Sequence, residues 1–341
     1  MNIEEKQTAE AQPARGADFR AGLSQESGAP TGNRPRLSIG MPVYNGENYI
    51  AAALDSLLEQ TFRDFELIIS DNASTDSTPQ ICAEYASRDP RVRYFRNERN
   101  IGLVRNFNRA FELSSGEYFK FAPHDDIYDR DFLARCIRIL DEDPSVVLCN
   151  ANVAIIDETG QVVRKLPPEL NADRNEPQER FLALLNNSKC FDLFGVIRRN
   201  ALAGMPQPLY QSYGNSDGVL LARLGLIGRF RYIEDHLYFN RDYKDRSGNK
   251  YKSYREYTYF LDPSTKGKII YPRWRMLREF ARSISLVPLD RRQRFRCAGH
   301  LARWTGWYWK SLAANIAIGA YETLLYPWKR LLRIREQGER P

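Results

Sequence analysis

The sequence predicts an α/β protein with a mostly parallel sheet, helices on both of its faces and a further helical region at the carboxyl end. Between residues 37 and 126, short apolar runs alternate with segments of helical periodicity. Such alternation indicates parallel strands joined by right-handed crossovers. The chain has 341 residues, 43% of them hydrophobic, which is enough for a sizeable core in one large domain or two ordinary ones.

The first strand, helix and strand are typical of a β-α-β unit. Leu37–Met41 is a short apolar run that ends in the turn cluster Pro42–Gly46. Asn48–Gln60 follows with its apolar side chains on one helical face, and Phe65–Ser70 is a second buried strand. That strand ends on the polar stretch Asp71–Asp76.

The alternation continues through a third and a fourth strand. Thr78 precedes a proline in the first turn of a helix, and a strand is predicted at Val92–Phe95. Asn100–Gly102 interrupts the chain before a helix over Leu103–Leu113. The aromatic run Phe119–Phe121 is the fourth strand of the predicted sheet.

Charged side chains follow the fourth strand directly. Pro123 cannot donate to a sheet ladder, and His124, Asp125 and Asp126 come next. Two adjacent ionised carboxylates repel each other, so a site that keeps both usually supplies a cation, a hydroxyl or backbone N–H groups. The alternative is that these residues cap a helix or lie in a solvated turn. Asp129 satisfies the capping role by itself.

Asn45, Asp71 and Asp125 fall at the carboxyl ends of three predicted parallel strands. Such ends share the edge at which α/β sheets bind ligands, and this favours a ligand site over capping alone. Because neither G-x-G-x-x-G nor a P-loop motif is present, a bound nucleotide would be held differently. Asp71 could accept from a base or ribose, while Asp125 and Asp126 could meet ribose and a metal-bridged pyrophosphate. An Asx turn with a helix start is the alternative for Asp71–Asp76, and it suits Ser74 and Asp76 better than Asp71.

Beyond residue 145 the alternation becomes less regular. A helix is predicted to begin at Asp217, where a carboxylate either serves the helix dipole or presents a rigid acid to the loop before it. The other expected elements are a strand at Val146–Ile156, a hairpin turn at Asp157–Gly160, a helix at Glu176–Asn187, strands at Phe191–Ile197, Arg229–Ile233 and His236–Asn240, and a mobile polar loop at Arg241–Asn249.

Residues 266–341 carry the positive charge of the chain, with 17 Lys or Arg against 5 Asp or Glu. Within them Ser311–Trp328 is apolar, has Glu322 as its sole charged residue and is flanked by basic and aromatic residues. This profile predicts either a helix lying in an anionic membrane surface or a core helix of a helical subdomain. A nucleic acid partner and a membrane-spanning helix are disfavoured.

Residues 1–34 are rich in Ala, Gly, Gln, Ser and Pro and lack an apolar core run, so we expect a disordered tail rather than a signal peptide. The five cysteines are scattered and include no C-x-x-C pair. This spacing suggests neither a zinc site nor a disulfide framework, and it fits a reducing cytoplasm.

Four motifs occur in order between Leu37 and Asp126. They are P-V-Y-N at Pro42–Asn45, I-I-S-D-N-A-S-T-D ending at Asp76, N-x-x-N-I-G with a following R-N at Asn97–Asn106, and H-D-D at His124–Asp126. In this order and spacing they resemble the family 2 glycosyltransferases, inverting enzymes of the GT-A fold. The segment Ser216–Gly225 resembles the acceptor-side segment of a bacterial subgroup.

The resemblance implies a hexosyltransferase that moves a sugar from a nucleotide-diphosphate sugar to a hydroxyl of a glycan or lipid-linked saccharide, with Asp217 as general base. It places Mg²⁺ or Mn²⁺ at Asp125 and Asp126. Pro123 and Tyr243 depart from the family pattern, and both changes remove possible metal ligands. The residues that the resemblance assigns to the nucleotide sugar are Pro42, Tyr44, Asn45, Asp71, Asn72, Arg105, Asp125 and Arg241.

On this resemblance, residues 35–260 form the catalytic domain, with 35–126 for the nucleotide sugar and 127–260 for the acceptor. Residues 261–341 form the basic helical region. A role in bacterial polysaccharide and cell-envelope synthesis is implied. We expect the enzyme in the cytoplasm, with peripheral contact on the inner face of the cytoplasmic membrane.

The residues agree with this chemistry. A departing diphosphate needs positive charge, which a cation could supply together with Arg241 or Arg246.

Two other functions stay open. A nucleotidyltransferase would use a similar sheet and acidic pair, but should carry a glycine-rich basic loop after the first strand, unlike Asn45–Asn48. A non-catalytic nucleotide or glycan binder would keep Asp71 and lose the base.

Overall fold

The computed structural model describes residues 34–167, 172–186, 190–244, 246, 253–266 and 268–321. Apart from Arg34, the predicted tail at residues 1–34 lies outside the described residues, as do residues 322–341. The strands are β1 Leu37–Val43, β2 Phe65–Asp71, β3 Val92–Arg96, β4 Tyr118–Phe121, β5 Ile127–Tyr128, β6 Val146–Ile156, β7 Val162–Lys165, β8 Val196–Arg198 and β9 Arg229–Arg241. The helices are α1 Ile50–Leu58, α2 Thr78–Arg88, α3 Leu103–Glu112, α4 Phe132–Glu142, α5 Pro177–Leu184, α6 Arg199–Ala203, α7 Ser216–Ile227, α9 Tyr254–Leu261, α10 Pro272–Leu286 and α11 Arg291–Trp307.

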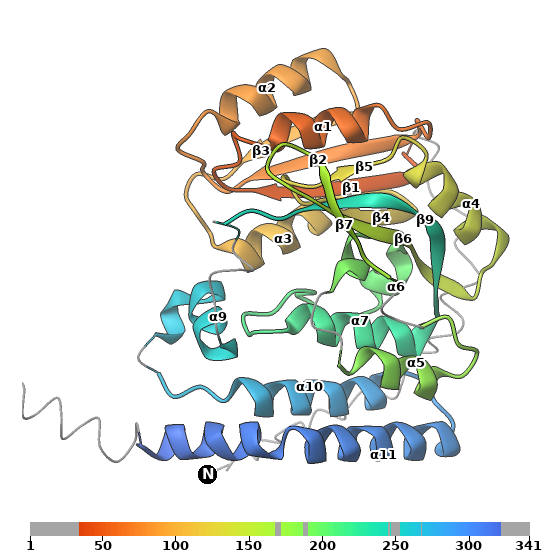
Figure 1. Cartoon of the computed structure of the whole chain (residues 1–341), viewed down its shortest axis with the longest axis vertical. Helices are drawn as coiled ribbons and strands as arrows, with labels where there is room; N and C mark the ends of the chain where they lie inside the picture. The colour runs from red at the N-terminus through yellow and green to blue at the C-terminus, as the bar shows by residue number, and fades with distance from the viewer. Residues whose placement is uncertain are drawn as a thin grey trace, which may run out of the picture. The chain divides into compact units, whose positions relative to one another are not determined.

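A single sheet organises these elements, with strand order β3-β2-β1-β4-β8-β6-β9-β5 and β7 paired to β6 (Figure 1). β1 pairs in parallel with β2 and β4, β2 with β3, and β6 with β9 along most of its length. The antiparallel pairings, of β8 with β4 and β6, of β5 with β9 and of β7 with β6, are shorter. The predicted α/β sheet of mostly parallel strands is confirmed, as is the hairpin between β6 and β7.

Helices cover both faces of this sheet, as the sequence predicts. On one face, α1 and α4 contribute Leu54 and Phe132 to an apolar cluster with β1, β2 and β6. On the other face, Phe111 of α3 and Leu221 of α7 join Phe119 of β4 in a second cluster. Figure 1 shows α1 and α2 above the sheet and α5 and α7 below it.

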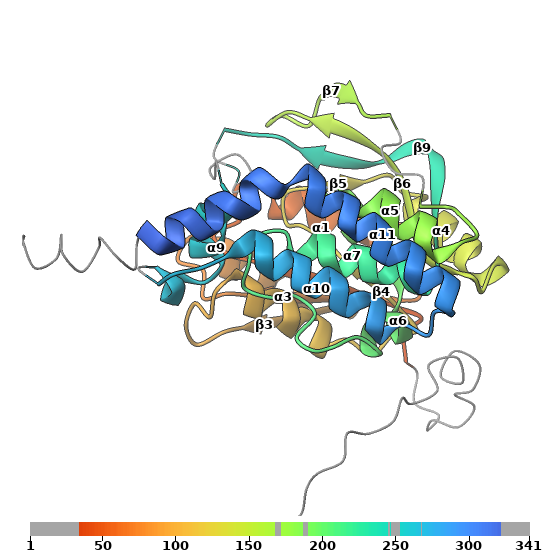
Figure 2. The same cartoon turned by 90° about the horizontal axis from the view of Figure 1, so that it is seen from below.

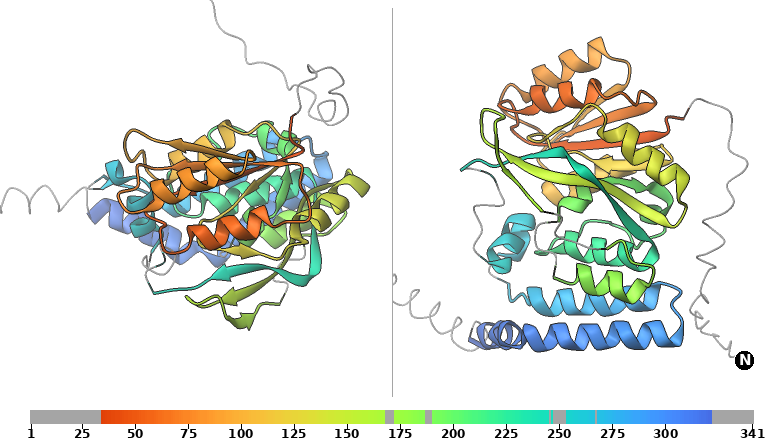
Figure 3. Two further views of the ribbon diagram at one scale, coloured as in Figure 1. Left: turned by 90° about the horizontal axis from the view of Figure 1, so that it is seen from above. Right: turned by 45° about the vertical axis from the view of Figure 1, so that its right-hand side comes forward.

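Helices α10 and α11 extend the second cluster. Phe280 of α10 and Trp304 of α11 are fully buried, and their rings meet edge to face with centroids 5.6 Å apart. Phe181 of α5 packs against Phe280 from the other side. α10 contacts α7 and α11 contacts α5, and the two helices pack against each other beneath that pair (Figures 1 and 3). Both helices are therefore part of this core, while the predicted division of the chain at residue 260 stays a prediction.

The apolar segment predicted at Ser311–Trp328 is described only up to residue 321. Residues 309–321 are helical, and the carbonyl of the buried Leu312 accepts a hydrogen bond from Trp274 Nε1–H at 3.0 Å. Farther along, Ile316 and Tyr321 are exposed. Among the helices within residues 34–321 that the structure describes, none has the length and apolar character needed to cross a bilayer.

The strand predicted at Phe191–Ile197 is wrong in its first half. Phe191–Phe194 is a 3-10 turn, and β8 begins only at Val196. The rings of Phe191 and Phe194 both pack edge-on against Tyr238, which a continuous strand with alternating faces would not allow for residues three apart. Periodicity cannot separate a short apolar strand from a short helical turn.

The two strands predicted at Arg229–Ile233 and His236–Asn240 are one continuous strand, β9. Its register against β6 shifts where Ile233 faces Ala151 and His236 faces the next residue, Asn152. The polar residues between them thus bulge out of the ladder, and the carbonyl of Glu234 accepts a hydrogen bond from Asn152 Nδ2 at 2.6 Å. The polar residues between the two predicted strands therefore form a β-bulge and do not end the strand.

Candidate active site

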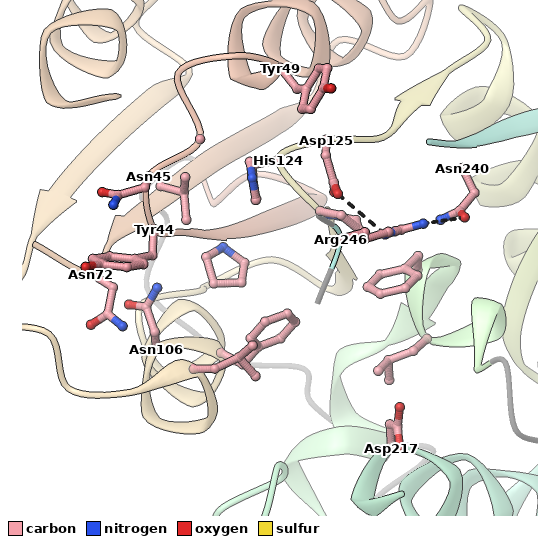
Figure 4. A pocket seen from close by; sticks show the side chains of 18 of the residues that line it. Tyr44, Asn45, Tyr49, Asn72, Asn106, His124, Asp125, Asp217, Asn240 and Arg246 are labelled. Carbon is pink, nitrogen blue, oxygen red and sulfur yellow. Dashed lines mark hydrogen bonds and ion pairs between the residues drawn. The ribbon is translucent and has the colours of Figure 1, made fainter. Parts of the chain in front are cut away.

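A cavity of about 1130 Å³ opens at the carboxyl edge of β1, β2 and β4 (Figure 4). Its walls come from the loops after these strands, from α3, from the 3-10 turn before β8, from the start of α7 and from α9. Parallel α/β sheets bind ligands at this edge. The volume is slightly above the usual range for small-molecule sites, about 300 to 1,000 Å³.

Two asparagines fix the loops after β1 and β2 at the cavity wall. Asn45 has a φ of +51°, and its Oδ1 accepts a hydrogen bond from the backbone N–H of Thr75 at 2.9 Å. Asn72 Oδ1 accepts from the N–H of Ile101 at 2.8 Å, and its Nδ2 donates to Asn100 Oδ1 at 2.8 Å. Of the residues that the resemblance assigned to the nucleotide sugar, those lining this side are Pro42, Tyr44, Asn45 and Asn72.

Asp71 precedes this wall and is fully buried. Its Oδ1 accepts a hydrogen bond from the N–H of Ser74 at 2.8 Å, and its Oδ2 accepts from Tyr94 OH at 2.7 Å and lies 3.4 Å from Arg96 Nε. The Asp71 carboxylate therefore closes the turn, a role for which the sequence wrongly favoured Ser74 and Asp76 over Asp71. Asp71 is not among the described residues that line the cavity, and its contact with a nucleobase stays a prediction.

Arg105 and Asn106, the R-N pair at the start of α3, differ in their position relative to the cavity. Arg105 is exposed and is not among the described residues that line the cavity. Asn106 lines it, and the side chain is held firmly, because Nδ2 donates to the carbonyl of Ser70 at 2.7 Å and Oδ1 accepts from Ser70 Oγ at 2.7 Å. The assignment of Arg105 to the nucleotide sugar stays a prediction.

Asp125 and Asp126 follow β4 and have different surroundings. Asp125 lines the cavity, and its Oδ2 accepts a hydrogen bond from Tyr243 OH at 3.1 Å. Asp126 is fully buried, and its Oδ2 accepts from Tyr238 OH at 2.6 Å while its Oδ1 accepts from the N–H of Arg241 at 2.9 Å. Burial, reinforced by the charge of Asp125, raises the pKa of Asp126 to about 6.

Two arginines, Arg241 and Arg246, contact this pair, and the cavity is lined by Arg246 and by a third arginine, Arg164. Arg241 lies behind the pair, where its Nε donates to the carbonyl of Asp125 at 2.9 Å, and it is not among the described lining residues. Arg246 lines the cavity, with Nε 3.6 Å from Asp125 Oδ2 and Nη2 3.4 Å from Asp126 Oδ1. Arg164 of β7 also lines it, although no sequence motif marked that residue.

The carboxylate pair is the place where a divalent cation would bind. Among the described residues, no group of three or more His, Cys, Asp or Glu side chains converges into a metal site made by protein alone. Mg²⁺, however, is commonly held by one or two carboxylates and completed by substrate phosphates and water. Asp125 lines the cavity, whereas Asp126 is fully buried and is not among the described residues that line it. A cation at this pair, completed by a bound nucleoside diphosphate, therefore stays a prediction.

Asp217 lies across the cavity from Asp125 (Figure 4). It is the second residue of α7, which follows Asn215 in the left-handed conformation with φ of +67°. The N–H of Gly218 donates to Asp217 Oδ1 at 3.0 Å, and the thiol of Cys190 donates to the same carboxylate. Burial raises the pKa of Asp217 above its ordinary value, and these two hydrogen bonds partly offset the rise.

Aromatic side chains form much of the wall between the two acidic sides. They come from α3, the 3-10 turn before β8, the segment before α7, and α9. Sequence reasoning missed this wall, because scattered aromatic residues are equally typical of a core. The aromatic residues on this wall are Phe107, Phe191, Phe194, Tyr210, Tyr257 and Phe260.

Comparison with known proteins finds a family that part of the chain matches. Residues 38–204 match the model of glycosyl transferase family 2. The protein EpsH of Bacillus subtilis is 31% identical over 156 residues, which are 46% of this chain and 44% of that protein. An uncharacterized glycosyltransferase of Rickettsia felis is 32% identical over 154 residues, 44% of this chain and 25% of that protein. Residues 38–204 thus match glycosyl transferase family 2, and the chain spans less than half the length of these relatives.

Solved structures show the same fold. A 349-residue portion of Staphylococcus aureus TarS in complex with UDP-GlcNAc aligns with a TM-score of 0.58 at 20% identity, over 80% of this chain and 73% of that one. The complex of this portion with UDP gives a TM-score of 0.55 at 21% identity, over 80% and 72% of the two chains. The predicted GT-A fold is thus confirmed.

Proposed function

We propose that this protein is an inverting glycosyltransferase of the hexosyltransferase type, which uses a nucleotide-diphosphate sugar and a hydroxyl acceptor. One observation carries the proposal: a single cavity has Asp125 on its sheet side and Asp217 on its opposite side. The match of residues 38–204 to glycosyl transferase family 2 supports it. Since one fold serves many functions, the arrangement of the site matters more here than the architecture.

The donor is proposed to lie along the sheet edge. Mg²⁺ or Mn²⁺ held by Asp125 and Asp126 would neutralise charge on the diphosphate when bound. Arg164, which lines the cavity, supplies further positive charge, and an arginine fork matches phosphate geometry. The nucleoside is proposed to contact Pro42, Tyr44, Asn45 and Asn72, with Asp71 supporting this loop from behind.

The acceptor is proposed to bind between Asp217 and the donor sugar. Asp217 takes the proton of the acceptor hydroxyl while that oxygen forms a bond to the anomeric carbon and the bond to the diphosphate breaks. Attack from the face opposite the leaving diphosphate inverts the anomeric carbon. The aromatic wall offers apolar ring faces against which the acceptor can pack.

The pH dependence of transfer should report the raised pKa of Asp217. A base must be deprotonated, so kcat/KM for the acceptor should fall as the pH drops through that pKa. This acidic limb should therefore lie above about pH 3.9, the ordinary value for aspartate. Removing the thiol donor with Cys190→Ala should move the limb to higher pH, because the hydrogen bond favours the carboxylate.

Cys190→Ser is the matched control for this measurement. A serine hydroxyl can donate to Asp217 from the same position, so its pH profile should stay near that of the natural protein. An acidic limb that does not move in Cys190→Ala would show that another group controls the profile.

We further propose that the acceptor is a lipid-linked saccharide on the inner face of the cytoplasmic membrane, and that α11 and residues 309–321 meet the lipid. Between residues 291 and 321 the chain has six Lys or Arg and no Asp or Glu. Figure 2 shows α10 and α11 crossing the lower face. The exposed apolar side chains of this stretch are Phe295, Trp307, Trp309, Ile316, Ile318 and Tyr321.

Sedimentation with anionic phospholipid vesicles tests the membrane contact. The protein should sediment at low salt, and binding should decline but persist at high salt, because charge attraction is screened and apolar burial is not. Phe295→Ser combined with Trp309→Ser should remove the salt-resistant part. Val163→Ser, which removes an apolar side chain 60% exposed on β7, is the control and should change nothing. Natural protein that stays in the supernatant at low salt would contradict the proposal.

A thermal-shift screen of purified protein against UDP, GDP and dTDP sugars, with and without Mn²⁺, tests the proposed donor class. Binding to the folded state raises the melting temperature, so at least one donor should do so at concentrations well above its Kd. A protein that none of these nucleotide sugars stabilises would not be the proposed transferase.

A further inference from the structure

We propose that Arg246 is a built-in counter-cation of the carboxylate pair, so that a divalent ion binds Asp125 and Asp126 only after the guanidinium has moved away. The inference rests on the proposed function for the identity of the ion, Mg²⁺ or Mn²⁺. Its test needs no sugar donor, so the two proposals can fail separately.

The contacts of Arg246 place its guanidinium directly against both carboxylates. Nε lies 3.6 Å from Asp125 Oδ2, and Nη2 lies 3.4 Å from Asp126 Oδ1. The third nitrogen, Nη1, donates to Asn240 Oδ1 at 2.5 Å and to the carbonyl of Arg241 at 2.6 Å. The group is thus held in one position by four partners, and Figure 4 shows it between Asp125 and Asn240.

The other contacts of Asp126 come from within the protein. Its Oδ2 accepts hydrogen bonds from Tyr238 OH at 2.6 Å and Asn240 Nδ2 at 3.0 Å, and its Oδ1 accepts from the N–H of Arg241 at 2.9 Å. A carboxylate offers about four acceptor sites, and the contact with Arg246 takes the remaining one. An ion approaching Asp126 from the cavity therefore meets the guanidinium first.

Electrostatic repulsion prevents Arg246 and a divalent ion from occupying the carboxylate pair at the same time. An arginine stays protonated, so Arg246 compensates about one of the two negative charges permanently. A divalent ion at the same oxygens would lie within a few ångströms of that guanidinium, and like charges at such distances repel strongly in a buried site. A divalent ion compensates both carboxylates, so it can still displace Arg246 at sufficient concentration.

The competition between Arg246 and the ion should change the apparent Kd of the ion by a measurable factor. When the binding-competent state is only a fraction of the population, the apparent Kd rises by the inverse of that fraction. If Arg246 occupies the pair in nine molecules of ten, its removal should tighten ion binding about tenfold. Mn²⁺ alone is a suitable probe, since its binding can be followed by calorimetry without nucleotide.

The experiment compares Mn²⁺ affinity in the natural protein, in Arg246→Gln and in Arg164→Gln. Arg246→Gln should bind Mn²⁺ about tenfold tighter or more. Arg164→Gln removes the same charge from the cavity lining and has no ion pair with Asp125 or Asp126 among the described contacts, so it should stay within about twofold. Adding Asp125→Asn to Arg246→Gln should abolish the gain.

The proposal is overturned if Arg246→Gln and the natural protein bind Mn²⁺ equally, if neither binds it, or if Arg164→Gln gains as much. Should Arg246→Gln fail to fold in a thermal melt, Arg246→Lys replaces it. A lysine keeps the charge but loses the planar fork that reaches both carboxylates. It should show a smaller gain of the same sign, and an affinity equal to that of the natural protein would then overturn the proposal.

Discussion

Replacing Asp217 by Asn should lower the transfer rate by about a hundredfold or more and leave donor binding nearly intact. The amide keeps the size of the side chain and can still accept from the N–H of Gly218, as Asp217 Oδ1 does at 3.0 Å. It cannot take a proton from the acceptor hydroxyl. Initial rates at saturating donor and acceptor, with donor affinity measured in parallel, check this expectation.

Asp192→Asn is the matched control for that substitution. Asp192 is also a buried aspartate, close in sequence to Cys190, but it is not among the described residues that line the cavity. Its amide variant should keep a rate within a few-fold of the natural protein. If Asp217→Asn retains near-normal turnover with the true acceptor, Asp217 serves only to start α7.

Trp304→Ala should destabilise the fold by about 3 to 5 kcal/mol, the usual cost of emptying a large buried aromatic site. Trp304 has no exposed surface and contacts Phe280 of α10 and the ring of Tyr308, with centroids 5.6 and 4.9 Å away. Urea unfolding followed by fluorescence or circular dichroism would measure the loss, and the reduced tryptophan signal makes circular dichroism the better probe.

Trp307→Ala, in the same helix, is the control. Trp307 is 52% exposed, so its removal should change the free energy of unfolding by about 0.5 kcal/mol or less. A large difference between the variants would establish that α11 belongs to the cooperative fold, whatever its outer face binds. Equal, small losses would show that α11 is not part of it.

The sequence predicted the first half of the fold well, because local patterns there have clear periods and clear ends. The strands β1 and β2 and the helices α1 and α3 end within two residues of their predicted bounds. Their parallel order also predicted that polar residues after β1, β2 and β4 would meet at one edge. Asn45, Asn72 and Asp125 do line one cavity.

Side-chain direction was less predictable than position. Asp71 stands at the expected edge, but its carboxylate is taken by Tyr94 of β3 and by the turn that follows. Arg241 is likewise turned toward the backbone behind the carboxylates. A motif places a residue in the chain, whereas partners distant in sequence decide where its side chain points.

Long-range pairing explains how residues distant in sequence reach the cavity, and of these residues only Arg246 was named from the sequence, as a possible source of positive charge for the diphosphate. Arg164 reaches the cavity because β7 pairs with β6, and Arg246 reaches it by crossing back to a carboxylate pair that lies 120 residues earlier. The aromatic wall is assembled from four separate segments. None of these residues carries a local signal that distinguishes a cavity lining from a core or a surface.

Calorimetric titration of the stabilising nucleotide sugar into three proteins tests the central claim most directly. The natural protein and Asp217→Asn should bind the donor with similar Kd, while Asp125→Asn should bind it at least about tenfold more weakly, because it loses one charge-assisted contact of about 1.5 to 3 kcal/mol. That pattern would place the donor on the Asp125 side of the cavity and leave Asp217 for the acceptor. Equal donor affinity in all three proteins, or a loss confined to Asp217→Asn, would contradict the account.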